Sequence, residues 1–139
     1  MKRATKQDAK LLLGFIHTFD TPEMKEAMNW FHEEFSADDY KEFKSKYPKG
    51  SPGLRHVGTM LSKYEVAGAL VSQGLMNEDL FFDVSEIGFV WEKLGKVISG
   101  WQKEASPQLW ENAVWLAERQ KKWQKEVWKP NQKWKLKAR

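Results

Sequence analysis

Apolar residues recur at alternating intervals of four and three positions through the middle of the chain. The stripe between residues 57 and 75 consists of Val57, Leu61, Tyr64, Gly68, Val71 and Leu75, and Met60 and Ala67 widen it. This spacing keeps side chains on one face of an α-helix. The pattern predicts an amphipathic helix, and Gly74 supplies a left-handed residue that ends it.

A second stripe follows after Asn77, which is placed to cap a helix start. It consists of Leu80, Val84, Ile87, Trp91, Leu94, Ile98 and Trp101. This is the strongest helical signal in the sequence. Gly88 and Gly95 lie beside the stripe and would let a partner helix approach closely. Whether the helix is continuous around Ser85 and Gly88 stays open.

The N-terminal half carries further helix starts. Thr21 is a capping residue, and Pro22 suits the first helical position because its missing N–H needs no partner there. Helical spacing follows in Met24, Ala27, Met28, Phe31 and Phe35. Ser36 is predicted to start another short helix, with Asp39 completing an approximate capping box. Residues 48–53, "PKGSPG", are predicted to be a loop.

The last helix is predicted to open with Ser106 as its cap and Pro107 in its first position. Its stripe, broken by Gln120, consists of Leu109, Ala113, Leu116, Trp123 and Val127. Pro130 should end the helix around Trp128 or Lys129. No segment shows the period-two alternation of a strand. We therefore predict an all-α fold, a single compact bundle of five or six helices over residues 1–128 with a basic tail at 129–139.

Composition narrows the class of protein. A chain of 139 residues fits one domain, and its 41% hydrophobic and 14% aromatic residues exclude a disordered protein. Without cysteine there is neither a disulfide nor a thiolate site. The apolar run "LLLGFI", residues 11–16, is too short to span a bilayer, and acids follow at Asp20 and Glu23. We expect no transmembrane segment and no signal peptide, and a cytoplasmic location.

Few residues suggest catalysis. The three histidines, His17, His32 and His56, fall on different predicted elements without a metal-binding spacing. No phosphate-binding loop or nucleophile motif is present. We expect no metal site, no cofactor, no catalytic residue and no enzymatic activity.

Glu65 is the one carboxylate that stands within an apolar segment, "KYEVAGALV". It lies at the edge of the helical stripe rather than within it. One interpretation is a boundary residue that bonds to a neighbouring helix or to water. The other is a buried acid with a raised pKa, which would mark a functional cleft.

Several tryptophans are candidates for an interface. Trp30 flanks the stripe of its helix, Trp101 lies on the long stripe, and Trp115 points away from the stripe of the last helix. Each could instead pack in the core.

The C-terminal stretch has the most unusual charge. Residues 119–139 carry nine Lys/Arg and one acid, Glu126, a net +8, so the first 118 residues carry −4 of the chain's +4. The candidate polyanion-binding residues are Arg119, Lys121, Lys122, Lys125, Trp128, Lys129, Lys133, Trp134, Lys135, Lys137 and Arg139. Such an arm could bind nucleic acid or an anionic membrane. Alternatively, it is a solubilising tail, or it docks on the acidic remainder of its own or a neighbouring chain.

Residues 61–119 resemble an uncharacterised bacterial and phage family, domain of unknown function 4760. The matching features are Tyr64 and Glu65, Gly74 and Leu75, Glu78 and Asp79, Trp91 with Glu92, and Trp110 through Glu118. The resemblance implies a helical fold and no known activity. Relatives commonly carry an N-terminal membrane helix, which is not expected in this chain. They also tend to have an arginine near the position of Trp101 and Gln102, which is not basic here, so a possible partner for Glu65 is missing.

Together these patterns predict a non-enzymatic helical interaction module that binds a protein partner or itself, with a homodimer as one form. The alternative is nucleic-acid binding through the basic C-terminal arm. A helical enzyme with a cleft around Glu65 ranks third.

Overall fold

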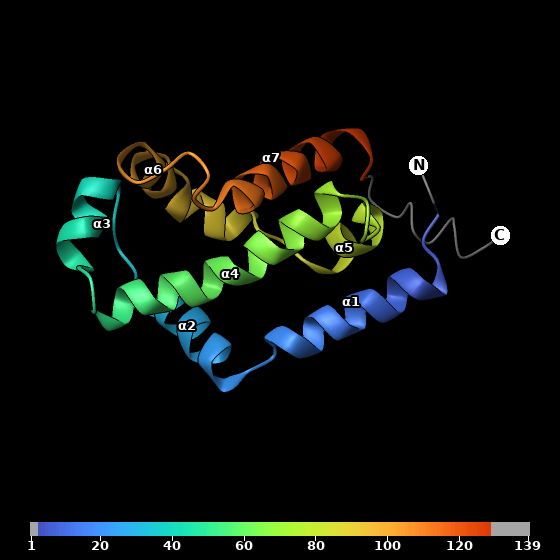
Figure 1. Cartoon of the computed structure of the whole chain (residues 1–139), viewed down its shortest axis with the longest axis horizontal. Helices are drawn as coiled ribbons and strands as arrows, with labels where there is room; N and C mark the ends of the chain where they lie inside the picture. The colour runs from blue at the N-terminus through green and yellow to red at the C-terminus, as the bar shows by residue number, and fades with distance from the viewer. Residues whose placement is uncertain (1–2, 129–139) are drawn as a thin grey trace.

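The structure, a computed structural model, describes residues 3–128 and contains seven helices and no strand over that range (Figure 1). The helices are α1 (Lys6–Phe19), α2 (Pro22–Glu33), α3 (Tyr40–Lys46), α4 (Pro52–Ser72), α5 (Glu78–Val84), α6 (Gly88–Glu104) and α7 (Glu111–Glu126). The all-α prediction is confirmed. The predicted count of five or six helices is too low.

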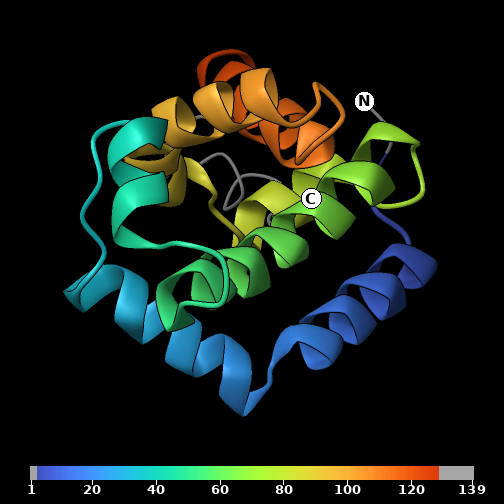
Figure 2. The same cartoon turned by 60° about the vertical axis from the view of Figure 1, so that its left-hand side comes forward.

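Helix α4 is the central element, with α7 packed along one side and α2 along another (Figures 1 and 2). Helix α3 packs against α6, and α1 packs against α5. The fully buried side chains come from most of the helices and include Phe31, Phe43, Met60, Leu61, Phe81, Leu94, Ile98 and Leu116. Most residues of the two predicted stripes therefore meet in one hydrophobic core, whereas Leu75 and Val84 are 59% and 58% exposed.

Local start and stop signals are confirmed at several helix ends. Thr21 accepts a hydrogen bond from the Met24 N–H, with Pro22 in the first turn of α2. Asn77 caps α5 by accepting from the Leu80 N–H. Gly74 has the left-handed conformation expected of it, with φ +72°. These residues act within one turn of the helix end, which is why the sequence reveals them.

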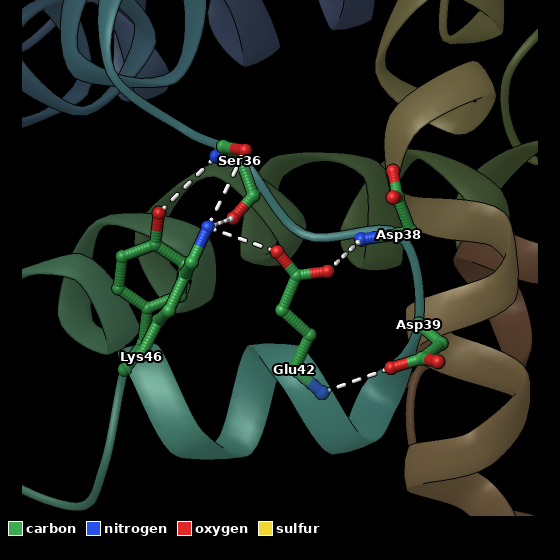
Figure 3. Close-up of polar contacts among 6 residues, drawn as sticks. Ser36, Asp38, Asp39, Glu42 and Lys46 are labelled. Atoms are coloured by element: carbon green, nitrogen blue, oxygen red, sulfur yellow. Dashed lines mark hydrogen bonds and ion pairs between the residues drawn. The ribbon is translucent and has the colours of Figure 1, made fainter.

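The predicted helix start at Ser36 is wrong, since α3 begins at Tyr40 with Asp39 as its cap. Side chains of α3 hold the preceding segment in an extended loop (Figure 3). Lys46 Nζ donates to the Ser36 carbonyl at 3.0 Å, and Glu42 accepts from the Asp38 N–H at 3.0 Å. These two side chains supply hydrogen-bond partners for the Ser36 carbonyl and the Asp38 N–H. The backbone groups are therefore paired without a helix at this position.

The predicted start of the last helix at Ser106 is also wrong. Residues 107–110 form turns, and α7 begins at Glu111 after Trp110, which adopts a left-handed conformation with φ +55°. The amide of Gln102 donates to the Leu109 carbonyl at 2.7 Å and holds these turns against α6. The predicted loop at 48–53 likewise ends two residues early, because Ser51 caps α4 and Pro52 opens it.

Candidate functional site

Glu65 holds the start of α7 from a different helix. Its Oε1 accepts from the backbone N–H groups of Asn112 and Ala113, both at 3.1 Å, and its Oε2 accepts from the Asn112 amide at 2.7 Å. No side chain of the α7 start itself caps the helix. Free N–H groups at a helix start need such acceptors, and a negative charge there is favourable. The structure thus agrees with the interpretation of Glu65 as a boundary residue bonded to a neighbouring helix.

Gly68, one turn after Glu65, lets α4 and α7 approach closely. A Cβ atom at this position would lie 2.1 Å from the Asn112 carbonyl oxygen. Such a contact is impossible without moving the α7 backbone away from α4. Glu65 and Gly68 together therefore set the position of the first turn of α7.

Three residues of α7 connect it to α5 and to the segment that follows α5. Arg119 makes a bidentate ion pair with Glu78 at 2.6 and 2.8 Å, which raises the pKa of the guanidinium. Trp123 Nε1 donates to Asp79 Oδ1 at 2.7 Å. Between them, the buried Gln120 accepts from the Ile87 N–H and donates to the Ser85 carbonyl, both at 2.9 Å.

These bonds resolve the question of continuity around Ser85. Helix α5 ends at Val84, Ser85 is extended, and α6 begins at Gly88. Gln120 supplies the partners that the backbone loses where the helix is interrupted. Gln120, which interrupts the apolar stripe of α7, therefore stabilises the interruption between α5 and α6.

A cleft of about 540 Å³ opens between α5 and the end of α7. Its lining residues are Phe82, Asp83, Glu86, Gln120, Trp123, Gln124 and Trp128. The side chains of Asp83, Glu86 and Trp128 are exposed, and Phe82 and Trp123 form its buried floor. The cleft thus combines two carboxylates with three aromatic rings.

A groove of about 350 Å³ lies between α1 and α4. Five of its lining residues are apolar: Leu11, Phe15, Phe19, Val66 and Leu70. Lys10, Gly14 and Thr18 follow one another at four-residue intervals along α1 and complete the lining. A Cβ atom at Gly14 would meet nothing within 4 Å, so this glycine leaves the groove open.

The three tryptophans predicted as interface residues are half-buried and packed against the core. Trp30 contacts the rings of Tyr47 and His56, with centroids 5.2 and 5.3 Å away. Trp101 contacts Phe43 at 5.4 Å and also packs near Trp110 at 6.1 Å. Trp115 packs against the core from α7.

The candidate polyanion-binding residues divide into three groups. Arg119 is paired with Glu78. Lys121, Lys122 and Lys125 are exposed on α7, and Trp128 is 50% exposed. The remaining candidates, Lys129, Lys133, Trp134, Lys135, Lys137 and Arg139, lie outside the described residues.

A polar cluster joins α3 to α6. Glu104 accepts from the Tyr40 hydroxyl and from Lys44 Nζ, the latter at 2.6 Å. The bond to the carboxylate, with some burial, raises the pKa of Tyr40 to about 12, whereas Lys44 and Tyr40 lower the pKa of Glu104. All three groups lie on the surface and face one another, so the cluster fastens α3 to α6.

Within the described part of the chain, no group of three or more His, Asp or Glu side chains is arranged to hold a metal ion. His32 stacks on Phe89 at 4.8 Å, and His56 packs on Trp30. No helix among residues 3–128 has both the length and the apolar character needed to cross a membrane.

Sequence patterns did not single out the two surface pockets. The groove side chains of α1 belong to "LLLGFI" and its neighbours. Their spacing is helical, but it does not indicate which face of the helix is left uncovered. Asp83 and Glu86 belong to an acidic segment, residues 77–87, with four acids and no base. Residues 33–39 hold as many acids in fewer positions, so charge density alone does not single out the cleft.

The fold and these surfaces define an all-helical protein with an apolar groove on one side and an acidic, aromatic cleft on another. The chain belongs to the family described as Domain of unknown function (DUF4760), whose model matches residues 4–123. This confirms the resemblance expected from residues 61–119 and extends it to α1. No curated protein and no solved structure matches the chain.

Proposed function

We propose that this protein is a non-enzymatic helical interaction module that binds an amphipathic helix of a protein partner in the groove between α1 and α4. The observation that carries the proposal is the groove itself, an open depression lined by five apolar side chains. Burial of water-exposed apolar surface by a partner favours binding by about 25 cal/mol per Å². Grooves between helices are a common site for this type of binding.

The charge beside the groove favours a partner helix with carboxylates. Lys10 lines the groove, and Lys6 lies one turn before it on the same side of α1. Both side chains are exposed, and neither has an acidic residue of the described chain within salt-bridge distance. An apolar helix flanked by glutamates would bury its apolar face in the groove and place its charges near these lysines.

The proposal is tested with two labelled peptides of identical leucine stripe, one flanked by glutamates and the other by lysines, in fluorescence anisotropy. We expect the glutamate peptide to bind more tightly. Val66→Glu should weaken its affinity about tenfold or more, because the change puts a carboxylate inside the apolar groove.

Ile16→Glu is the matched control. Ile16 is 45% exposed, close to the 43% of Val66, and lies on α1 outside the groove lining. Its replacement should leave the affinity unchanged. Equal affinity for both peptides, or equal loss in both variants, would refute the groove as the binding site. Dimerisation that Val66→Glu abolishes, measured by sedimentation, would show that the occupant is a second copy.

Nucleic-acid binding is the second candidate, supported by Lys121, Lys122 and Lys125, which are exposed on α7 directly before the basic tail. A surface of this type binds phosphates with an affinity that falls steeply as salt rises. Binding of oligonucleotides by the full chain should then weaken several-fold in the variant Lys121→Gln/Lys122→Gln/Lys125→Gln. Lys6→Gln/Lys10→Gln is the control, and equal binding by both variants would remove this candidate.

A further inference from the structure

Helix α1 lies at the edge of the molecule and carries a row of exposed residues along one face (Figures 1 and 2). This row, the α1 seam, consists of Lys6, Ala9, Leu13, Ile16 and Asp20, at alternating intervals of three and four positions. Such spacing is that of the contact positions in a coiled coil. All five residues are exposed, and the side chains in the middle of the seam are apolar, with Leu13 65% and Ile16 45% exposed.

The seam is separate from the other two surfaces of α1. Leu12 and Phe15 are buried in the core. The groove between α1 and α4 is lined by other residues of α1, among them Leu11 and Gly14, and shares none with the seam. A partner on the seam therefore leaves the groove open, and an inference about the seam goes beyond the proposed function.

Opposite charges stand at the two ends of the seam. Lys6 begins it, Asp20 ends it, and Glu23 continues the same spacing into the first turn of α2. Lys6 and Glu23 are exposed, and neither has an oppositely charged group of residues 3–128 within salt-bridge distance. Asp20 pairs with Lys25 at 3.6 Å, and exposed pairs of this type contribute little. The surface that complements the seam is therefore the seam itself, running in the opposite direction.

We propose that two copies of the chain associate through the α1 seam as an antiparallel, two-fold symmetric pair of helices. The symmetry axis passes between Leu13 and Ile16, so that Leu13 of each copy packs on Ile16 of the other. The next contact brings Ala9 of each copy beside Asp20 of the other, and the small side chain of Ala9 allows the two helices to approach closely. Two-fold symmetry makes every contact occur twice.

The charges at the ends of the seam select the antiparallel direction. In this direction Lys6 of each copy meets the acidic end of the other, Asp20 and Glu23. In a parallel pair Lys6 would lie beside a second Lys6 and Asp20 beside a second Asp20, and like charges oppose association. Because α1 has 14 residues, the pair buries less than the roughly 800 Å² per partner of a standard interface. We therefore expect a weak, reversible dimer.

The first test is sedimentation of the full chain at increasing concentration, up to the millimolar range. The parent chain should show a reversible monomer–dimer equilibrium, and Leu13→Ser/Ile16→Ser should weaken it about tenfold or more. Leu75→Ser/Val84→Ser is the matched control, because Leu75 and Val84 are 59% and 58% exposed and lie outside the seam. Its association should equal that of the parent chain. A parent chain that stays monomeric, or equal weakening in both variants with helices intact by circular dichroism, would overturn the proposal.

A charge swap tests the pairing of the ends. Lys6→Glu alone and Asp20→Lys/Glu23→Lys alone should each weaken the dimer several-fold, because each variant places like charges at both ends of the antiparallel pair. An equimolar mixture of the two variants should restore association to at least the level of the parent chain, since every end then meets its opposite charge. A mixture that fails to recover, or single variants that associate like the parent chain, would contradict the pairing.

Cross-linking tests the direction, because the sequence has no cysteine of its own. In an oxidised mixture of Ala9→Cys and Asp20→Cys chains, the disulfide should form mainly between the two different variants. Disulfides mainly between identical variants would show a parallel pair and overturn the proposal. It would also be overturned if the parent chain stayed monomeric and bound vesicles of phosphatidylcholine and phosphatidylserine in a manner that Leu13→Ser/Ile16→Ser abolished, since the seam would then be a membrane contact.

Discussion

Glu65 of α4 accepts hydrogen bonds from the backbone N–H and the side-chain amide of Asn112, at 3.1 and 2.7 Å. The residues are 47 positions apart in sequence, yet the carboxylate performs for α7 what Thr21 performs for α2 from its own helix end. The start of α7 thus depends on the correct packing of α4.

Replacement of Glu65 should therefore destabilise the protein through α7. Glu65→Ala leaves two backbone N–H groups without their acceptor, and we expect a loss of about 1–3 kcal/mol in the free energy of unfolding. Urea unfolding measures the loss, and faster hydrogen exchange at Asn112 and Ala113 locates it. Glu118→Ala, at an exposed position of α7, should cost less than about 0.5 kcal/mol. Equal losses in the two variants would contradict the capping role.

Two glycines of α4 should respond to alanine in opposite directions. A Cβ at Gly58 would meet nothing within 4 Å, so Gly58→Ala should stabilise the protein by about 0.5–1 kcal/mol through helix propensity. At Gly68 the Cβ would lie 2.1 Å from the Asn112 carbonyl oxygen, so Gly68→Ala should destabilise it. Thermal unfolding of the two variants beside the parent chain checks the sign of each effect.

Gln120 should be required for the break between α5 and α6. Gln120→Leu keeps the size of the side chain but leaves the Ile87 N–H and the Ser85 carbonyl without partners. We expect a loss of about 2–3 kcal/mol, since buried unpaired backbone groups are costly. Gln124→Leu is the comparison. Gln124 is exposed on the same helix, so this variant should lose far less unfolding free energy. Similar unfolding midpoints for both variants would count against the bridging role.

The ion pair of Arg119 and Glu78 should show measurable coupling. Both side chains are partly buried and the pair is bidentate, so a double-mutant cycle with Arg119→Met and Glu78→Gln should give about 1 kcal/mol. The coupling should fall as salt rises. The exposed pair of Lys25 and Asp20, at 3.6 Å, should give a value near zero in the same experiment. Indistinguishable coupling energies would contradict this ranking.

Alkaline pH should destabilise the protein through Tyr64. Burial, followed by the negative charge of Glu86, raises the pKa of this phenol to about 12, against about 10 when unfolded. Its contribution is therefore complete below about pH 10 and is lost as the pH rises towards about 12. Two pKa units correspond to about 3 kcal/mol at most.

Urea unfolding at about pH 9 and about pH 11.5 measures this loss in the parent chain and in Tyr64→Phe, which cannot ionise. Other groups, Tyr40 among them, titrate in both proteins, so the difference between the two isolates Tyr64. An identical loss of stability in the parent chain and the variant would show that Tyr64 does not carry it.

Sequence patterns identified α2 and α4 as helices and placed Thr21, Gly74 and Asn77 correctly, because each of these residues acts within one turn of its own backbone. The same rules failed at Ser36 and Ser106. Both serines are good capping residues, but Lys46 holds the carbonyl of Ser36, and Gln102 holds the turns after Ser106. In both places a side chain of a neighbouring helix, α3 or α6, holds the backbone in a non-helical form.

The candidate sites follow the same division. Glu65 was recognisable as an acid at the boundary of an apolar face, and its partner became visible only when α7 was packed against α4. The groove and the cleft lie between helices distant in sequence, so no local pattern marks them. By itself the sequence determined the helical class, several helix ends and the opposite charges of residues 77–87 and the C-terminal segment. Only the tertiary structure decided where α5 ends and where α6 and α7 begin, because there the hydrogen-bond partners of the backbone come from distant helices.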